Sequence, residues 1–431
     1  MGSCVFPQDF LFGTATAALQ VEGGDTNTNW YRWAEMGHIK DKTSPLRAND
    51  HWNRYKEDTE LLAELGVQTH RMGLEWSRIE PEKGKYSSDA IQHYRDEISL
   101  LLKHNIRPLV TLYHFSHPLW FEDTNGWENE QNVTSFLSFV RYVVENLKDL
   151  VSDWVTINEP NVYLSYGYVL GLWPPGKQDV GAMINAARNM VTAHIKAYEL
   201  IHELRPSAAF EQPTRVGVAY HLRVFDPFWV LSPLDHISSW LNRFVFQDIF
   251  LEGMGRGLFL PPLGRGYPLG KGVYQDFLGI NYYSRDMVQF CWKPTELFAR
   301  RLVKKGALTN DLGWEIYPRG LYLLGKALYK KYKLPIFITE NGTCDREDRF
   351  RSRFIFDHLK EVCRLIGEGV PVERYYHWTF IDNFEWIEGE SAPFGLLAND
   401  YALQKRTFRS SALLYKEICK TKTLSEDMLL N

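Results

Sequence analysis

The chain has 431 residues, of which 45% are hydrophobic and 14% aromatic, and its formal net charge is −4 with a pI near 6.4. This length allows either several domains or one large α/β barrel. The balanced charge creates no large basic field, which argues against a nucleic-acid partner, and no apolar run approaches the length of a membrane span.

The cysteines and the first residues bear on the cellular compartment. Cys4, Cys291, Cys344, Cys363 and Cys419 are scattered and show no CxxC spacing. This distribution argues against a disulfide framework or a zinc site and favours a reducing compartment. The first ten residues lack the basic and apolar regions of a signal peptide. We therefore expect a cytoplasmic protein.

Short apolar runs alternate with amphipathic segments along the chain, without internal repeats or low-complexity stretches. Strands are expected at residues 11–17, 69–75, 107–114, 153–158, 215–221, 277–283, 335–340 and 374–380. Apolar residues recur at helical spacing in segments 55–65, 91–102, 136–147, 183–204, 321–328, 354–362 and 410–419. Segment 222–276 has no assigned element, and its part 253–272 is rich in Gly and Pro.

Eight strands that alternate with helices predict an α/β fold, a single (β/α)8 TIM barrel that spans residues 1–431 as one domain. A doubly wound open sheet is the main competitor. No glycine-rich phosphate loop follows the first strand, and this favours the barrel.

Polar side chains follow several of the predicted strands, where a barrel of this kind places its chemistry. The residues concerned are His114, Asn158, Glu159, Asn281, Tyr283 and Glu340, and the eighth strand continues past Trp378 towards Asp382 and Glu385. Their convergence predicts a pocket that holds a hydroxyl-rich ligand at the C-terminal end of the barrel.

Two of these residues are glutamates, Glu159 and Glu340, and each ends an apolar run beside an Asn. Two carboxyl groups, one acting as acid and one as nucleophile, are what the cleavage of a glycosidic bond requires.

Five motifs stand in order along the chain: FGTATAALQVEG (12–23), TINEP (156–160), GINYY (279–283), ITENG (338–342) and DNFEW (382–386). With these motifs the chain resembles glycoside hydrolase family 1, the β-glucosidase-like family, over essentially its whole length. The resemblance implies that Glu340 is the nucleophile and Glu159 the acid/base. It also implies that Arg71 and Tyr283 support Glu340, with Asn281 as a further supporting residue.

The resemblance further assigns residues to the non-reducing sugar, namely Gln20, His114, Asn158, Trp378, Glu385, Trp386 and Phe394. It implies a retaining mechanism, with carboxyl groups about 5–5.5 Å apart rather than about 6.5–9.5 Å. Glu340 should then be ionised, and the pKa of Glu159 should be raised so that it starts protonated.

The function that follows is a retaining exo-acting β-glycosidase, with β-glucosides ranked first and β-galactosides and β-fucosides as further substrates. Glu385, and the absence of Lys from segment 391–396, favour unphosphorylated sugars. The expected partner is a small β-glycoside or oligosaccharide, without cofactor, metal, nucleic acid or membrane. The sequence leaves the oligomeric state open.

Two departures from the family pattern affect the pocket. The segment Phe115-Ser116-His117 replaces Trp-Asp-Leu, which alters one wall, and the short segment 222–276 predicts a more open aglycone side.

A transglycosidase with the same carboxylates and a catalytically weak sugar-binding barrel are the alternatives. A barrel aldolase or isomerase is disfavoured, because no Lys and no cluster of metal ligands stands at the strand ends.

Overall fold

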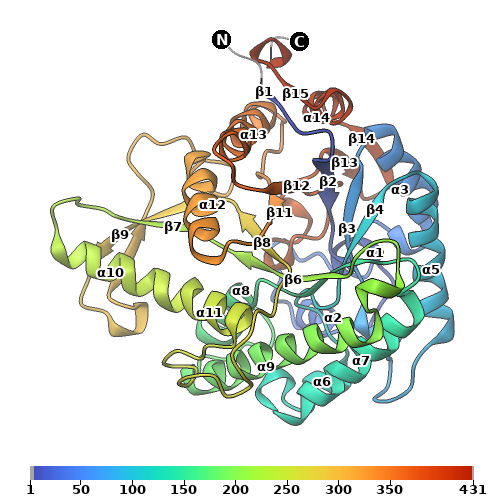
Figure 1. Ribbon diagram of the computed structural model, residues 1–431, viewed down its shortest axis with the longest axis horizontal. Helices are drawn as coiled ribbons and strands as arrows, with labels where there is room; N and C mark the ends of the chain where they lie inside the picture. The colour runs from blue at the N-terminus through green and yellow to red at the C-terminus, as the bar shows by residue number, and fades with distance from the viewer. Residues whose placement is uncertain (1–3, 430–431) are drawn as a thin grey trace.

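The computed structural model describes residues 4–429 and contains a closed barrel of eight parallel strands (Figure 1). In spatial order the strands are β2 (Leu11–Ala15), β3 (Thr69–Gly73), β4 (Arg107–Thr111), β5 (Asp153–Asn158), β6 (Arg215–His221), β8 (Phe277–Tyr282), β11 (Ile336–Asn341) and β12 (Val372–Trp378), which closes on β2. The predicted (β/α)8 barrel is therefore confirmed. The first three and last two residues of the predicted span 1–431 lie outside the described part.

The barrel strands are buried on both faces, which is why they are near-continuous apolar runs rather than alternating patterns. All six residues of β5 and of β11 are buried, for example. Some strands end earlier than predicted, such as β4, which stops at Thr111 rather than at His114. The residues beyond Thr111 leave the ladder and turn towards the end of the barrel, where His114 lines a pocket.

Helices surround the barrel, and every predicted helical segment is found. These helices are α3 (His51–Leu65), α5 (Ser88–Lys103), α7 (Gln131–Leu147), α9 (Val180–Leu204), α12 (Arg319–Tyr332), α13 (Arg351–Gly367) and α14 (Ser410–Thr421). Local sequence sets their ends: the Ser87 hydroxyl accepts from the backbone N–H of Ala90 to begin α5, and Gly66 ends α3 at φ 77°. Shorter helices are α1 (Ala18–Glu22), α2 (Asn29–Glu35), α4 (Trp76–Ile79), α6 (Leu119–Glu122) and α8 (Pro160–Leu164).

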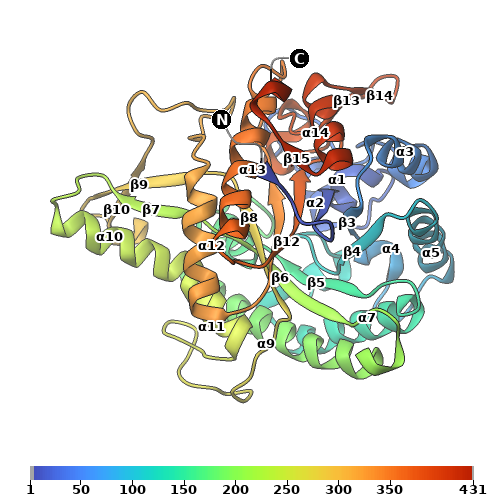
Figure 2. The same ribbon diagram turned by 45° about the horizontal axis from the view of Figure 1, so that its top comes forward.

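The two ends of the described chain lie side by side, because β1 (Cys4–Val5) pairs antiparallel with β15 (Thr423–Leu424). Figure 2 shows β15 beside α13 and α14. Here Cys4 and Cys363 form a disulfide with 6.5 Å between their Cα atoms. The sequence argued against a disulfide framework, and its cysteine spacing gave no sign of this single link between residues 359 positions apart.

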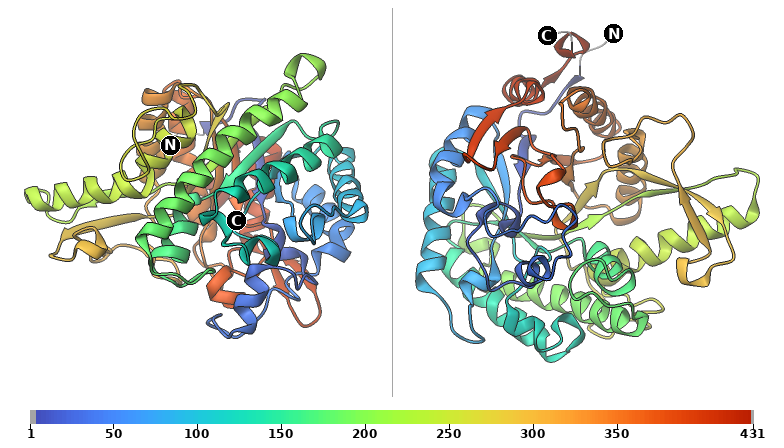
Figure 3. Two further views of the ribbon diagram at one scale, coloured as in Figure 1. Left: turned by 90° about the horizontal axis from the view of Figure 1, so that it is seen from below. Right: turned by 180° about the vertical axis from the view of Figure 1, so that it is seen from behind.

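A small sheet and one helix extend from the barrel as an arm (Figures 1 and 3). The arm consists of β7 (Val224–Pro227), α10 (Pro233–Arg243), β9 (Arg285–Phe290) and β10 (Ala299–Leu302), whereas the buried helix α11 (Ile249–Arg256) packs against α9. The sequence predicted none of these elements, because the strands are short and only partly buried. A separate hairpin is formed by β13 (Leu397–Asp400) and β14 (Lys405–Phe408).

At the N-terminal end of the barrel, which we call the base, three arginines surround one buried carboxylate. Asp153 lies 2.5 Å from Nε of Arg107, 3.2 Å from Nε of Arg215 and 3.0 Å from Nη2 of Arg374. Burial raises the pKa of Asp153, but the three cations outweigh it and hold the pKa below its usual value. This cluster joins the beginnings of β4, β5, β6 and β12.

Candidate active site

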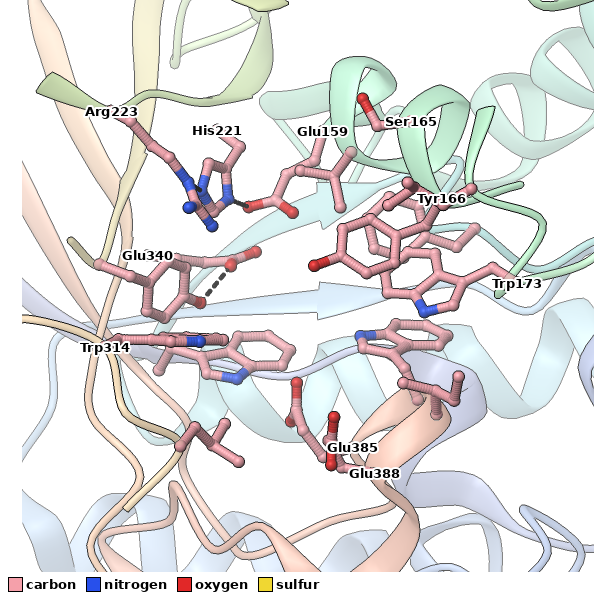
Figure 4. A pocket seen from close by; sticks show the side chains of 18 of the residues that line it. Glu159, Ser165, Tyr166, Trp173, His221, Arg223, Trp314, Glu340, Glu385 and Glu388 are labelled. Carbon is pink, nitrogen blue, oxygen red and sulfur yellow. Dashed lines mark hydrogen bonds and ion pairs between the residues drawn. The ribbon is translucent and has the colours of Figure 1, made fainter. Parts of the chain in front are cut away.

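A pocket opens at the C-terminal ends of the barrel strands, a region we call the mouth, and both predicted catalytic glutamates line it (Figure 4). Glu159 follows β5 and Glu340 lies in β11. Six other predicted site residues line the pocket: His114, Tyr283, Trp378, Glu385, Trp386 and Phe394. Four lie behind this lining and contact it through hydrogen bonds, namely Gln20, Arg71, Asn158 and Asn281.

Both carboxylate oxygens of Glu340 accept hydrogen bonds from predicted partners. Nη1 of Arg71 donates to Oε1 at 2.5 Å, and the hydroxyl of Tyr283 donates to Oε2 at 2.6 Å. Burial raises the pKa of Glu340 to about 7, although Arg71 and Tyr283 act to lower it. The neighbouring charge of Glu159 contributes to this increase. Glu340 is thus a buried carboxylate that two donors hold in a fixed orientation.

Glu159 is held in a backbone conformation that is uncommon for residues other than glycine, with φ 41° and ψ 58°. Such conformations cost about 1–3 kcal/mol and persist where the surroundings impose them, often at functional sites. Its Oε1 accepts from Nδ1 of His221 at 3.0 Å and from Nδ2 of Asn281 at 2.9 Å.

The expected raised pKa of Glu159 is wrong in this structure. Burial raises the pKa of Glu159, but His221 and the hydrogen bond from Asn281 lower it by more. The expectation failed because it omitted His221, the last residue of β6. The two glutamates share one pocket, so their protonation is best treated as a property of the pair.

A hydrogen-bond network behind the glutamates joins four strands. Oδ1 of Asn158 accepts from Nη2 of Arg71 at 2.6 Å and from Nδ2 of Asn281 at 3.0 Å. The hydroxyl of Thr339 donates to Oδ1 of Asn281 at 2.6 Å. Since these residues lie in β3, β5, β8 and β11, the network fixes the spacing of the strand ends that carry the glutamates.

The buried polar atoms near the pocket that have no hydrogen-bond partner among the described residues include Oε1 of Gln20, Nδ1 of His114 and Nε1 of Trp173. Nδ2 of Asn158 donates to Nε2 of His114 at 2.9 Å, so the proton of this imidazole sits on Nδ1. Burial lowers the pKa of His114 well below its usual value, which keeps the ring neutral. A free acceptor and a free donor at one pocket suit a ligand with hydroxyl groups.

Glu385 adds a third carboxyl group to the pocket. Nε2 of Gln20 donates to its Oε2 at 3.2 Å. Burial raises the pKa of Glu385 to about 8, and the charge of Glu340 contributes to the increase, while hydrogen bonds from Trp378 and Gln20 oppose it. The lining thus contains four glutamates, Glu159, Glu340, Glu385 and Glu388, beside two arginines, Arg223 and Arg301.

Aromatic side chains form one wall of the pocket. The ring of Phe115 lies 5.0 Å from that of Trp173 and 5.0 Å from that of Trp386. Of the three departing residues only Phe115 reaches the pocket, because Ser116 donates to Glu75 and His117 pairs with Glu122. The predicted change in one wall is therefore a change at Phe115.

Several lining residues were absent from the predictions, among them Tyr166, Trp173, His221, Arg223, Arg301 and Trp314. His221 could have been found, because it ends a correctly predicted strand. Arg223 and Arg301 come from or near the arm, whose elements the sequence did not reveal. Two residues of segment 222–276, Arg223 and Phe246, reach the pocket.

Within residues 4–429, no group of three or more His, Cys, Asp or Glu side chains is arranged to hold a metal ion. In the same part of the chain, no helix has both the length and the apolar character needed to cross a membrane.

Comparison with known proteins gives a consistent result. The family model described as "Glycosyl hydrolase family 1" matches residues 3–259 and 271–424. Beta-glucosidase A of Thermotoga maritima is 30% identical, with 98% of this chain and 99% of the relative covered. A beta-galactosidase of Sulfolobus acidocaldarius is 28% identical, with 98% of this chain and 96% of the relative covered.

Solved structures agree with these sequence matches. A beta-glycosidase from Pyrococcus horikoshii is 33% identical and superposes with a TM-score of 0.91, covering 100% of this chain and 98% of that structure. The beta-glucosidase from Thermotoga maritima in complex with glucoimidazole is 29% identical with a TM-score of 0.89, covering 97% of this chain and 99% of that structure.

Proposed function

The chain belongs to glycosyl hydrolase family 1, and from that premise we propose that it is an exo-acting β-glycosidase that prefers unphosphorylated β-glucosides. Glu340 acts as the nucleophile and Glu159 as the acid/base. The observation that carries this proposal is that both glutamates line one pocket, with Arg71 and Tyr283 donating to the two oxygens of Glu340.

The proposed reaction has two displacements. In the first, Glu340 attacks the anomeric carbon while Glu159 gives its proton to the leaving oxygen. In the second, water gives a proton to Glu159 and attacks the same carbon, which releases the sugar and frees Glu340. In the free pocket Glu340 has the higher pKa of the pair, so the productive form is the one in which the single proton lies on Glu159 and Arg71 and Tyr283 stabilise the ionised Glu340.

The sugar preference is inferred from the polar side of the pocket. Gln20 and Glu385 would hold the hydroxyls at O3 and O4, and Glu385 would also reach O6, beside Phe394. Asn158 would contact the 2-hydroxyl, and His114 would donate through the free proton on Nδ1. Trp378 would form the floor below the sugar ring, with Trp386 beside it. Glu385 offers no positive charge to a phosphate, and its ionised form would repel one, which supports unphosphorylated substrates.

Relatives named beta-glucosidase and beta-galactosidase both match at about 30% identity, so galactosides stand as further candidates. A glycosyl-enzyme formed on Glu340 would also react with alcohols that reach the mouth. Apolar side chains there, Leu170, Trp173 and Leu312, favour organic acceptors and support transglycosylation as a second candidate activity. A binding-only barrel is disfavoured, because neither glutamate has been replaced.

The proposal is tested by hydrolysis of p-nitrophenyl β-glucoside, β-galactoside, β-fucoside and 6-phospho-β-glucoside. We expect the glucoside to be turned over fastest and the phosphoglucoside slowest. Glu340→Ala should lower kcat by about 10⁴-fold or more, and azide should restore turnover to Glu159→Ala by replacing water as nucleophile. A folded wild-type protein that hydrolyses none of these glycosides would refute the proposal.

A further inference from the structure

Three side chains lie in a row along one edge of the pocket: Arg223, His221 and Glu159 (Figure 4). Nε of Arg223 lies 3.0 Å from Nε2 of His221, and Nδ1 of His221 lies 3.0 Å from Oε1 of Glu159. His221 is 5% exposed. The proposed two-step reaction gives neither His221 nor Arg223 a role.

The arginine determines which nitrogen of the imidazole carries the proton. The Nε of an arginine can only donate, so Nε2 of His221 must accept. The remaining proton therefore sits on Nδ1, and His221 donates to Oε1 of Glu159. With Nε2 accepting and Nδ1 donating, the His221 imidazole is a directional donor to Glu159.

The same oxygen of Glu159 receives a second donor, Nδ2 of Asn281, at 2.9 Å. Two N–H groups are directed at Oε1. A proton on that oxygen would point at these donors, neither of which can accept it. The acidic proton of Glu159 is therefore directed to Oε2.

We propose that His221, oriented by Arg223, is a positioning residue that reserves Oε2 of Glu159 for the proton delivered to the glycosidic oxygen. This inference depends on the proposed function of Glu159 as acid/base. His221 keeps its own proton on Nδ1 throughout and acts only through Glu159.

The proton and bond changes in both steps balance with this assignment. In the first step the proton leaves Oε2 for the glycosidic oxygen as the bond from that oxygen to the anomeric carbon breaks. The bond to Glu340 forms, the aglycone departs as a neutral alcohol, and two donors stabilise the new carboxylate at Oε1. In the second step a water proton returns to Oε2 while the hydroxide oxygen displaces Glu340.

The surroundings hold the row in place. Nη1 of Arg223 lies 3.3 Å from Oδ1 of Asp286, so the cation is anchored on the side away from His221. The rings of Tyr283 and Phe246 lie 5.7 and 5.9 Å from the His221 ring. The titratable or charged groups around the imidazole are thus Glu159, Arg223 and Tyr283, with Glu340 and Asp286 one contact further away.

The test compares His221→Phe with the wild type on phenyl β-glucoside and 2,4-dinitrophenyl β-glucoside. Phenoxide needs a proton to leave, whereas dinitrophenoxide does not. We expect kcat/KM for the phenyl glucoside to fall by about 10- to 100-fold and that for the dinitrophenyl glucoside to change by less than about threefold. Because a donor to the carboxylate is lost, the basic limb of the kcat/KM profile should move up by about one pH unit.

Two further variants keep the test decisive. His221→Gln retains an N–H donor and should recover most of the phenyl glucoside activity. Arg223→Met leaves the imidazole free to change tautomer and should again affect the phenyl glucoside more than the dinitrophenyl glucoside. His202→Phe is the matched control, because His202 also contacts a carboxylate, Asp276 at 2.8 Å, but does not line the pocket. It should leave the substrate ratio and the basic limb at wild-type values.

Equal losses on both glucosides in folded variants, or a basic limb that does not move, would overturn the positioning role of His221. If His221→Phe does not fold, the same comparison of the two glucosides is made with Arg223→Met, and equal losses on both would again overturn the positioning role. A wild-type protein that hydrolyses neither glucoside would instead refute the proposed function, and the inference with it.

Discussion

The two ends of the barrel each bury a charged cluster, but the clusters are built in opposite ways. At the base, Asp153 is surrounded by Arg107, Arg215 and Arg374, and its pKa is held below the usual value. At the mouth, burial raises the pKa of Glu340 to about 7 and that of Glu385 to about 8. Burial is similar at both ends, so the difference lies in how many opposite charges surround each carboxylate.

The mouth also keeps features that a purely structural cluster would lack. Gln20 and His114 have buried polar atoms without a partner among the described residues. Phe115, Glu159 and Trp386 adopt positive φ angles. Perturbed carboxyl pKa values, unpaired polar groups and backbone strain tend to gather where a protein binds or reacts. We infer that the cluster at the base stabilises the barrel, whereas the residues at the mouth are arranged for binding and reaction at a cost in stability.

The largest expected effect on stability is at the base. Asp153→Asn leaves three buried arginines without their anion and should lower the free energy of unfolding by about 3–5 kcal/mol. Denaturant unfolding measures this change, and kcat of the folded variant should stay near the wild-type value. Asp149→Asn is the control, because Asp149 pairs with Arg95 at the surface and is 54% exposed. Its cost should be below about 1 kcal/mol. Equal costs for the two variants would contradict the comparison.

The disulfide should contribute somewhat less. It links Cys4, just ahead of the N-terminal segment that borders the base, to Cys363 in α13. Cys363→Ser should lower the free energy of unfolding by about 2–4 kcal/mol, because the unfolded chain regains freedom. Thermal unfolding with and without reductant measures this, and reduced wild type should match the variant. Cys291→Ser, which changes a free cysteine, should have no such effect. Insensitivity of the wild type to reductant would show that the link is absent in solution.

At the mouth, removing a carboxyl group should reduce activity rather than stability. Glu385→Gln keeps the size of the side chain but removes its carboxylate, and kcat/KM for p-nitrophenyl β-glucoside should fall by about 10- to 100-fold. The melting temperature should stay the same or rise. At about pH 8 and above, where Glu385 is ionised, the ratio of 6-phosphoglucoside to glucoside turnover should increase in the variant, because the repulsion of the phosphate disappears. An unchanged ratio would remove Glu385 as the basis for excluding phosphorylated sugars.

The two ends should also respond to pH in opposite ranges. Because the pKa of Glu340 is raised to about 7 and belongs to the pair with Glu159, both carboxylates are ionised at higher pH. No proton is then left for the leaving group, so kcat/KM should fall by about tenfold per pH unit above about pH 7. A profile that stays flat to pH 9 would contradict this prediction.

The charged cluster at the base should lose its stabilising effect only at acidic pH. The folded pKa of Asp153 lies below its unfolded value, so its stabilisation is fully present above the unfolded pKa, about 3.9, and is lost as the pH falls through the folded pKa. The contribution of Asp153 to the melting temperature should therefore not change between about pH 5 and 8. Thermal unfolding of wild type and Asp153→Asn across this range tests the expectation.

The sequence alone determined the barrel and much of the candidate site. Parallel strands buried on both faces have to be apolar throughout, so each left a recognisable run, and polar residues after the runs marked the mouth. The run that became β5 identified Glu159, and the run that became β11 identified Glu340. Chain order and the alternation of strands with helices were sufficient for the fold class.

Only the tertiary structure decided the contacts between distant segments. The arm, the Cys4–Cys363 link and the row from Arg223 to Glu159 all join residues whose local sequence gives no sign of the partner. The pKa of Glu159 was predicted in the wrong direction for the same reason, because its sign depends on which donor reaches Oε1. Hydrogen bonds and charge interactions act over a few ångströms in space, and the position along the chain does not encode that distance.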